Sequence, residues 1–331
     1  MRATMKKNTF SGRSPGWALI PLLCLLLLSG CGNAESGAGG SSRPSAQGLS
    51  ASSAPTEGTR PNEPVVYLPE APGEATIGAE PLVIDVSNSS QGYVMARYEG
   101  SAAKANIQIT GPDGVTYKYF LSPSEAFRAL PLTSGSGAYA VGAYENIEGD
   151  RYSVLYKESI QVELENELLP FLYSNVYVEF TEKSEAVAKA EEIVAPASSD
   201  LEAVGLVYHY VVEHISYDTQ KAETVTAGYL PVVDETLRTG TGICFDYAAL
   251  TAAMLRSQNI PTKLEIGYAG TVYHSWISVY TEETGWIDRI IEFSGDAWTR
   301  MDPTFAASNG NSSAILKYIG DGSNYALKYS H

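Results

Sequence analysis

Apolar and polar residues alternate with a period of two from about residue 78 to residue 166. Successive side chains of a strand point to opposite faces of a sheet, so this alternation predicts strands with one buried face. Residues 111–114 (GPDG) predict a tight turn, and residues 148–150 (EGD) predict a hairpin. Six or seven short strands with such turns are typical of a small β-sandwich. The predicted strands are 82–86, 93–98, 105–110, 115–121, 138–144 and 152–164.

After about residue 170 the apolar residues recur at helical spacing instead. Ser199 is followed three residues later by Glu202, which predicts a capping box at the start of a helix. Helices followed by an antiparallel sheet predict an α+β fold for this half of the chain. The predicted elements are helices at 183–195 and 199–215, a loop at 218–242, a helix that begins near Cys244, and strands over 262–303.

The first 30 residues have the pattern of an export signal. Lys6, Lys7 and Arg13 precede an apolar run that is too short to span a bilayer. The run ends in residues 28–31 (LSGC), which resemble the bacterial lipobox, where the Cys thiol is the acceptor for diacylglycerol. The alternative is an ordinary cleaved signal peptide with an incidental Cys31. We favour lipidation because the run stops at this Cys, and we expect a protein anchored by lipid on the extracellular face of a bacterial membrane.

Residues 31–75 are rich in Gly, Ser, Ala and Pro, with almost no large apolar side chain in the first part. Such a composition buries too little surface to offset the entropy of ordering the chain, so the sequence predicts a flexible tether. The predicted organisation is a lipoprotein signal peptide at 1–30, a tether at 31–75, a small all-β, Ig-like sandwich domain at 76–166, and an α+β domain at 170–331.

The charge of the chain limits its partners. The sequence has 22 basic and 38 acidic residues, which gives a net charge of −16. Residues 1–30 hold four basic residues and no acidic ones, so their removal makes the net charge more negative, −20. Such a surface repels phosphate backbones and anionic headgroups, which argues against nucleic-acid binding. His209 and His214 are five residues apart, so they do not share a helix face as a zinc pair would. We expect no metal or other cofactor.

The three cysteines have different expected fates. Cys24 lies in the signal and Cys31 is the predicted lipid acceptor, which leaves Cys244 as a single free thiol. A free thiol in an exported protein is exposed to oxidation and needs a reason to be there. The alternative is a buried Cys244 that acts as a small hydrophobe. Composition leaves these two interpretations open.

Three segments carry candidate chemistry. Residues 240–250 (GTGICFDYAAL) place Cys244 at the start of a helix, where free N–H groups and the helix dipole favour a thiolate. Residues 273–280 (YHSWISVY) place His274 at the start of an alternating strand. Residues 298–305 (WTRMDPTF) place Asp302 before a proline, which should end its strand. Each segment is a weak signal alone, and the three in this order are specific.

Residues 205–305 resemble the transglutaminase-like superfamily, whose bacterial members show a G-x-C-x-D-Y-A-x-L helix start, an H-x-W strand and a W-x-x-x-D-P-T strand. The resemblance implies a papain-like α+β core in which Cys244 is the nucleophile, His274 the base and Asp302 the carboxylate that orients the base. The interval between His274 and Asp302 is longer than is common in the family. Asp288, which follows Trp286 closely, is therefore an alternative third member. We favour Asp302 because the Asp-Pro-Thr context is intact only there.

The resemblance implies acyl transfer from glutamine or peptide amides through a thiol. Water as the acceptor would make the protein a cysteine peptidase, and an amine would make it a cross-linking acyltransferase. The motif does not decide between them. The expected substrate is a surface protein or a peptidoglycan peptide, with contact to the membrane through the lipid anchor only. The alternative from another class is a non-catalytic binding or scaffold lipoprotein with the same fold.

Overall fold

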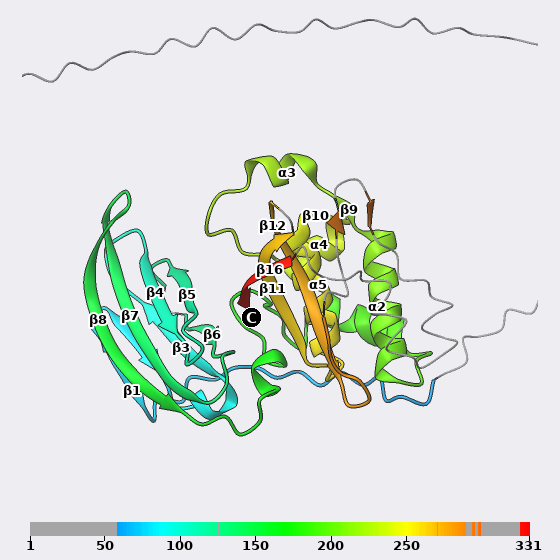
Figure 1. Cartoon of the computed structure of the whole chain (residues 1–331), viewed down its shortest axis with the longest axis horizontal. Helices are drawn as coiled ribbons and strands as arrows, with labels where there is room; N and C mark the ends of the chain where they lie inside the picture. The colour runs from blue at the N-terminus through cyan, green and yellow to red at the C-terminus, as the bar shows by residue number, and fades with distance from the viewer. Residues whose placement is uncertain (1–57, 125, 270, 289–292, 295–296, 299–324) are drawn as a thin grey trace, which may run out of the picture. The chain divides into compact units, whose positions relative to one another are not determined.

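The computed structural model describes residues 58–331 except 125, 270, 289–292, 295–296 and 299–324 (Figure 1). Cys31, the predicted signal peptide and Asp302 lie outside the described residues. The described residues all belong to one compact unit. Within it, a region of strands precedes a region of helices and strands, so the fold is mixed α/β.

The N-terminal region is built from strands that pair antiparallel. Its strands are β1 (Thr76–Ala79), β2 (Leu82–Asp85), β3 (Tyr93–Tyr98), β4 (Ala105–Thr110), β5 (Thr116–Leu121), β6 (Arg128–Pro131), β7 (Gly137–Glu148) and β8 (Arg151–Val162), with a 3-10 turn at Ser89–Gln91. They form two four-stranded sheets, in the orders β1-β2-β3-β6 and β5-β4-β7-β8. Buried side chains of both sheets, such as Ile84 and Ile107, belong to one hydrophobic cluster. The two sheets therefore share a core.

The alternation of apolar and polar residues predicted most of these strands. The turn predicted at residues 111–114 is confirmed, since the Gly114 N–H donates to the Gly111 carbonyl at 3.0 Å and Gly114 has φ of 81°. Sequence patterning missed β1 and β6, which have only four residues each. β2 is equally short but contains an apolar run at residues 82–84, which β1 and β6 lack.

The C-terminal region contains helices and another four-stranded sheet (Figure 1). Its helices are α1 (Glu185–Val194), α2 (Asp200–His214), α3 (Thr219–Thr224), α4 (Val233–Thr239) and α5 (Cys244–Arg256), after a 3-10 turn at Leu169–Phe171. Its strands are β9 (Ser216–Tyr217), β10 (Thr241–Gly242), β11 (Thr262–Ala269), β12 (Val272–Thr281), β13 (Gly285–Ile287), β14 (Phe293–Ser294), β15 (Ala297–Trp298) and β16 (Tyr325–Ser330). The main sheet has the antiparallel order β13-β12-β11-β16.

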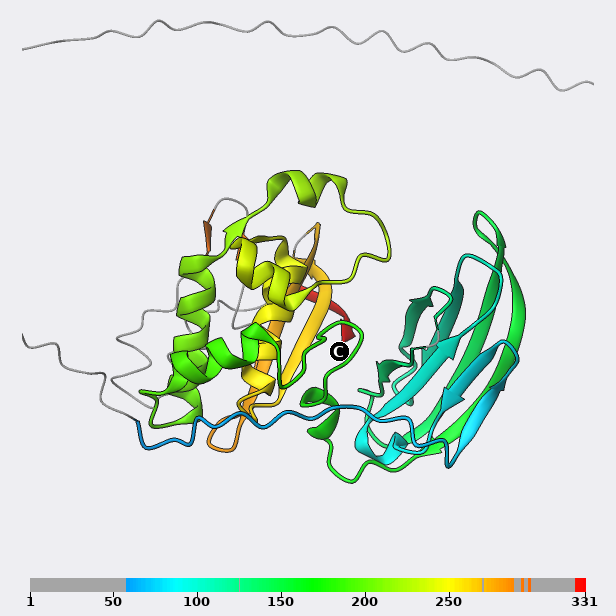
Figure 2. The same cartoon turned by 180° about the vertical axis from the view of Figure 1, so that it is seen from behind.

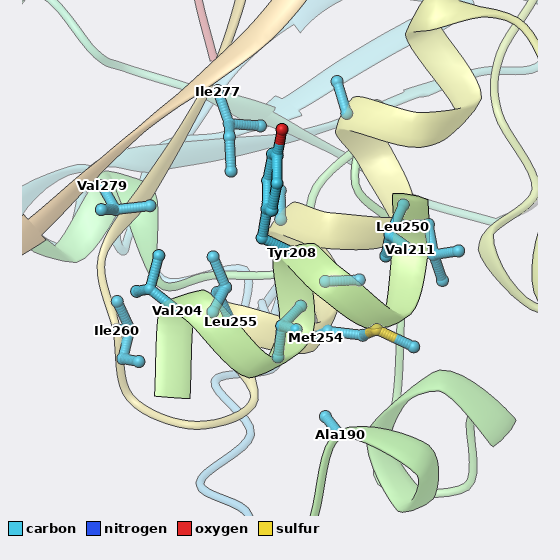
Figure 3. Close-up of a cluster of buried hydrophobic side chains, with 14 of the residues drawn as sticks. Ala190, Val204, Tyr208, Val211, Leu250, Met254, Leu255, Ile260, Ile277 and Val279 are labelled. Atoms are coloured by element: carbon cyan, nitrogen blue, oxygen red, sulfur yellow. The ribbon is translucent and has the colours of Figure 1, made fainter. Parts of the chain in front are cut away.

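Helix α5 is the centre of this region. It contacts β11 and β12 and also α1, α2 and α4 (Figure 2). All its residues from Asp246 to Arg256 are buried, as expected for a helix that is covered on every side. Figure 3 shows side chains of this core, among them Tyr208 and Val211 of α2 and Leu250 of α5. A central, fully packed α5 holds its first residue, Cys244, in a fixed place.

The predicted capping box at α2 is confirmed. The Ser199 hydroxyl accepts the Glu202 N–H at 3.2 Å, and the Glu202 carboxylate accepts the Ser198 N–H at 2.7 Å. The predicted loop at 218–242 is wrong, because α3 and α4 lie within it. Both helices are very short and carry little apolar periodicity, so tertiary contacts rather than the local pattern define them.

Part of the predicted tether is also wrong. From Gly58 onward the chain runs in extended form against the C-terminal region, and the Arg60 N–H donates to the Ala197 carbonyl at 3.1 Å. The Arg60 side chain forms a salt bridge to Asp200 at 2.7 Å, and the Val65 N–H donates to the Ser257 carbonyl at 2.8 Å. These contacts fix residues that the composition assigned to a flexible linker.

A buried arginine joins the end of α5 to the sheet. Arg256 has no exposed surface, and its guanidinium donates to the carbonyls of Thr262, Tyr173 and His331 at 2.8–3.0 Å. Burial lowers the pKa of Arg256 to about 9. Backbone carbonyls thus satisfy this side chain, and they hold β16 beside β11.

Candidate active site

Cys244 is the first residue of α5, and the chain enters the helix through a narrow approach. Ile243 is extended, and its N–H donates to the Asp246 carboxylate at 2.8 Å. A Cβ at Gly242 would lie 2.7 Å from the Cβ of Asp246, so only glycine fits there. Gly240 ends α4 with φ of 63°. These constraints place the Cys244 thiol at the positive end of α5.

The Cys244 thiol is a free thiol with intermediate exposure. Burial is the largest influence on it and raises its pKa above the usual value. The backbone N–H and the hydroxyl of Ser275 and the backbone N–H of Phe245 lie near the sulfur and act in the opposite direction. The nearby Asp246 carboxylate raises the pKa further. The resting group is therefore a thiol that is surrounded by donors suited to a thiolate.

His274 lies directly before Ser275 on β12 and is 4% exposed. Burial lowers the pKa of His274 to about 4. The imidazole is therefore neutral at physiological pH, which is the form that accepts a proton. Both Cys244 and His274 line the same cavity, which has a volume of about 520 Å³. The structure thus brings two of the three predicted site residues to one place.

The tryptophan of the H-x-W segment is held by a buried acid that sequence reasoning missed. Glu265, on β11, accepts hydrogen bonds from the Trp276 indole N–H and the Ser278 hydroxyl, both at 2.6 Å. The Trp276 ring centroid lies 6.2 Å from that of His274. Burial is the main reason that the pKa of Glu265 is raised. The sequence signal that could have identified Glu265 is an acidic residue between Leu264 and Ile266 in an otherwise apolar strand.

Asp288, the alternative third member, lies away from His274. β13 ends at Ile287, which pairs with Val279, and continuing that register by one residue would set Asp288 opposite Ser278. Ser278 and His274 are four residues apart, which is about 13 Å along a strand. Asp288 is exposed, and its charge acts on Glu265 and Lys263. This position does not suit a carboxylate that must hydrogen-bond to His274.

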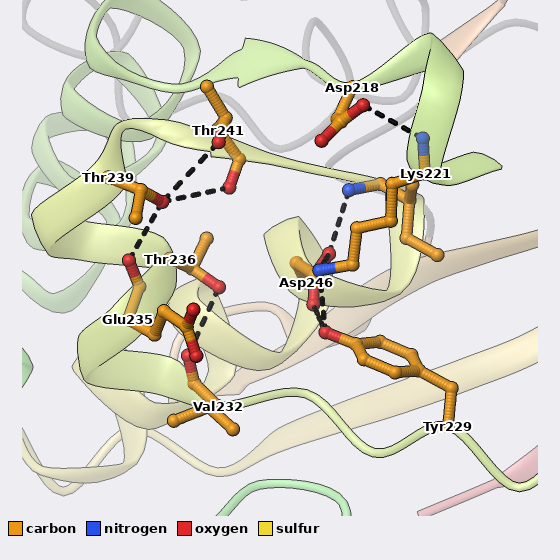
Figure 4. A network of polar contacts seen from close by, with 10 residues as sticks. Asp218, Lys221, Tyr229, Val232, Glu235, Thr236, Thr239, Thr241 and Asp246 are labelled. Atoms are coloured by element: carbon orange, nitrogen blue, oxygen red, sulfur yellow. Dashed lines mark hydrogen bonds and ion pairs between the residues drawn. The ribbon is translucent and has the colours of Figure 1, made fainter. Parts of the chain in front are cut away.

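A polar network joins α3 to the start of α5 (Figure 4). Asp246 has no exposed surface, and it accepts the Lys221 ammonium at 2.8 Å and the Tyr229 hydroxyl. Lys221 also donates to the Tyr229 hydroxyl at 2.7 Å. Residues 222 and 225–230 line the cavity next to Cys244. Asp246 therefore ties one wall of the cavity to the helix that carries the thiol.

We expect Asp246→Ala to lower the free energy of unfolding by about 3 kcal/mol, because it removes an acceptor and leaves a partly buried Lys221 without its partner. Urea denaturation measures the change. The matched control is Glu235→Ala, an exposed acid in the first turn of α4, which should cost less than about 0.5 kcal/mol. Equal losses of unfolding free energy in the two variants would show that the Asp246 network does not stabilise the cavity wall next to Cys244.

The remaining histidines lie in different surroundings. His209 and His214 are on α2, where the His214 Nδ1 lies 2.8 Å from the Tyr210 carbonyl oxygen. His331, which the sequence gave no reason to consider, is 2% exposed in the cavity wall, and its ring centroid is 4.2 Å from that of Tyr177. Across the described residues, no group of three or more His, Cys, Asp or Glu is placed to hold a metal ion. None of the helices among them is long and apolar enough to cross a membrane.

Residues 187–289 match the sequence profile of the transglutaminase-like superfamily. This segment is a transglutaminase-like domain. It runs from α1 to the residues that follow β13, and it holds both Cys244 and His274. The match ends before Asp302, and the sheet-rich N-terminal region lies outside it.

A curated relative matches part of the chain. Over 131 residues the chain is 28% identical to the UPF0252 protein MJ1282 of Methanocaldococcus jannaschii. The match covers 34% of this chain and 37% of that protein. The chain therefore spans little more than a third of this relative, whose name states no activity.

Three solved structures share features of the fold. The "Putative Cysteine Protease from Cytophaga hutchinsonii" has a TM-score of 0.36 and 14% identity, over 70% of this chain and 77% of that one. A "putative protease from Parabacteroides distasonis" has a TM-score of 0.26 and 12% identity, over 61% of each chain. Red sea bream transglutaminase has a TM-score of 0.24 and 14% identity, over 64% of this chain and 48% of that one.

Proposed function

We propose that this protein is a surface-anchored thiol enzyme that transfers the acyl group of a glutamine side chain or a peptide amide through Cys244. The observation that carries the proposal is the cavity that Cys244 and His274 line together in a transglutaminase-like domain. A neutral imidazole and a partly exposed thiol that lies near N–H and hydroxyl groups suit nucleophilic catalysis. Asp302 is the proposed third member.

In the proposed mechanism, His274 takes the thiol proton as the sulfur of Cys244 attacks the amide carbon. The new S–C bond converts the carbonyl into an oxyanion, to which the backbone N–H of Cys244 donates; one such donor is often worth ~3 kcal/mol. The C–N bond then breaks, and His274 returns the proton to the leaving amine or ammonia. Water or an acceptor amine releases the acyl group from the thioester. Asp302 holds the imidazole in the tautomer that these steps need.

The proposal is tested by incubation of the protein with a glutamine-containing donor and a labelled primary amine, with the Cys244→Ala variant as the control. Label that enters the donor only when Cys244 is present identifies a cross-linking acyltransferase. Peptide cleavage without label identifies a cysteine peptidase. If the donor is neither labelled, deamidated nor cleaved, the proposed activity is wrong.

The raised pKa of the Cys244 thiol predicts how its alkylation depends on pH. Less than the ordinary fraction of thiolate should be present at pH 7, so the iodoacetamide rate should be slower than for the unfolded protein. The rate should continue to rise above pH 9, the usual value for a thiol. Mass spectrometry at a series of pH values measures it. A rate that is already maximal at pH 6–7 would indicate a preformed thiolate–imidazolium pair and contradict this account.

We also propose that Cys31 carries the lipid that anchors the protein on the extracellular face of the membrane, and that the two N-terminal sheets are an Ig-like sandwich. Cys31→Ser should move the protein from the membrane fraction to the medium. Immunoblots of both fractions measure the shift, and Cys24→Ser, within the apolar run of the signal, is the matched control. Retention of the Cys31→Ser variant in the membrane fraction would refute lipidation at this residue.

A further inference from the structure

We infer that the cavity beside Cys244 selects protein segments with an aromatic or large apolar side chain next to the reacting amide, in preference to peptidoglycan stem peptides. The inference rests on the proposed function, because it names the substrate class of the same site. It further assigns one wall of that site to the N-terminal sheet β5-β4-β7-β8, which supplies Lys118, Tyr119 and Phe120 from β5.

Aromatic side chains dominate the lining of the cavity. The exposed and partly exposed ones come from β5, from the segment before α1, from the stretch between β9 and residue 229, from the start of α5, and from β12 and β16. They include Phe120, Tyr177, Tyr217, Tyr229, Phe245 and Tyr273. Such rings offer flat apolar surface at a low entropic cost. The volume of about 520 Å³ lies in the range of pockets that bind ligands.

Exposed apolar side chains gather at the rim of this cavity. Phe120 is 41% exposed, Val225 is 38% exposed and Tyr273 is 55% exposed, and each comes from a different part of the fold. Exposed apolar groups that converge on a concave site mark a binding surface.

The charges of the cavity also favour an apolar segment. None of the described lining residues is an Asp or a Glu, and Lys118 is exposed, so its ammonium stays in water. A charged substrate side chain that enters would lose hydration without a buried counter-charge. Stem peptides of peptidoglycan carry small or charged side chains, so they would use little of the aromatic surface and suffer this penalty.

Contacts with the C-terminal region hold the β5 wall in place. The Tyr177 hydroxyl donates to the Lys118 carbonyl at 3.3 Å, and the Thr133 hydroxyl donates to the Ser330 carbonyl at 2.6 Å. The ring centroids of Tyr117 and Tyr329 are 5.7 Å apart. The N-terminal sheet therefore presents Phe120 to the cavity within the same compact unit. Specificity by this sheet gives it a role beyond that of a spacer.

The test uses the full chain with Cys244→Ala, so that binding is measured without turnover. The probes are fluorescein-labelled glutamine peptides that differ only in the residue beside the glutamine, which is Phe, Ala or Glu, and a labelled stem peptide. We expect the Phe peptide to bind about 10-fold more tightly than the others by fluorescence anisotropy. Phe120→Ser should remove most of this preference. Val154→Ser, at another exposed apolar residue that lies on β8 and does not line the cavity, should leave it unchanged.

Equal binding of the peptides, tighter binding of the stem peptide, no binding at all, or a preference that survives Phe120→Ser would each overturn the inference. These outcomes are separate from a failure of the proposed function. A wild-type chain that turns over no amide while the Cys244→Ala chain prefers the Phe peptide would refute the enzyme and leave the binding preference. Turnover of an amide by the wild-type chain without any preference among the peptides would support the enzyme and refute the binding preference.

Discussion

Replacement of Cys244 by alanine is expected to lower the turnover of an amide substrate by at least ~10⁴-fold, because it removes the sulfur that forms the acyl bond in the proposed mechanism. Alanine is an excellent helix residue, and the side chain of Cys244 is not part of the packed core of α5. The fold should therefore remain. Rates of ammonia or peptide release, measured on equal amounts of folded protein, give the ratio.

The matched control for this change is Thr251→Ala, also on α5 but in its interior, where the hydroxyl donates to the Tyr247 carbonyl at 2.8 Å. This variant should lose some stability and keep its activity. If Cys244→Ala retains more than about a tenth of the activity, the nucleophile lies elsewhere. Circular dichroism of both variants separates loss of chemistry from loss of fold.

The second large effect is expected at Asp302. Asp302→Asn should lower turnover by ~10⁴-fold, since an amide in place of the orienting carboxylate favours the wrong imidazole tautomer. Asp288→Asn is the natural control, because Asp288 is exposed and the register places it opposite Ser278 rather than His274. Its turnover should stay within about 3-fold of the wild type.

The comparison of the two variants is decisive in both directions. A large loss for Asp288→Asn with little loss for Asp302→Asn would reverse the assignment of the third member. Large losses in both would point to a shared structural role, and urea denaturation of the two variants would then reveal the common loss of stability. Little change in either would remove the carboxylate from the mechanism.

The regular parts of this fold could be predicted because local patterns define them. Period two identified most strands of the N-terminal sheets, and the Ser199–Glu202 pair identified the start of α2. The helix start at Cys244 followed from its glycines and the motif around it. In each case the signal lies within about ten residues of sequence, where propensity and tertiary packing agree.

The parts that escaped prediction depend on contacts between distant segments. Residues 58–68 have a linker composition, yet Arg60 pairs with Asp200 across 140 positions of sequence. The helix α3 is short, and Lys221 ties it to Asp246. No local periodicity records such contacts.

The candidate site divides in the same way. Cys244 and His274 stand in recognisable motifs, and both line the cavity. Phe120 lies far from any motif, and Glu265 lies nine residues before His274; only the position of β5 and the pairing of β11 with β12 bring them to the site. The sequence therefore did not reveal the side chains that position other residues or line the cavity, whereas it did reveal the proposed reacting groups.

The most direct test of the central claim is to trap the acyl-enzyme. The protein is mixed with a glutamine-containing donor, quenched in acid and digested, and the peptide that contains Cys244 is examined by mass spectrometry. The account predicts a thioester adduct on Cys244 that forms before product and disappears when acceptor is added. Consumption of the donor with an unmodified Cys244, or an adduct on another residue, would contradict it.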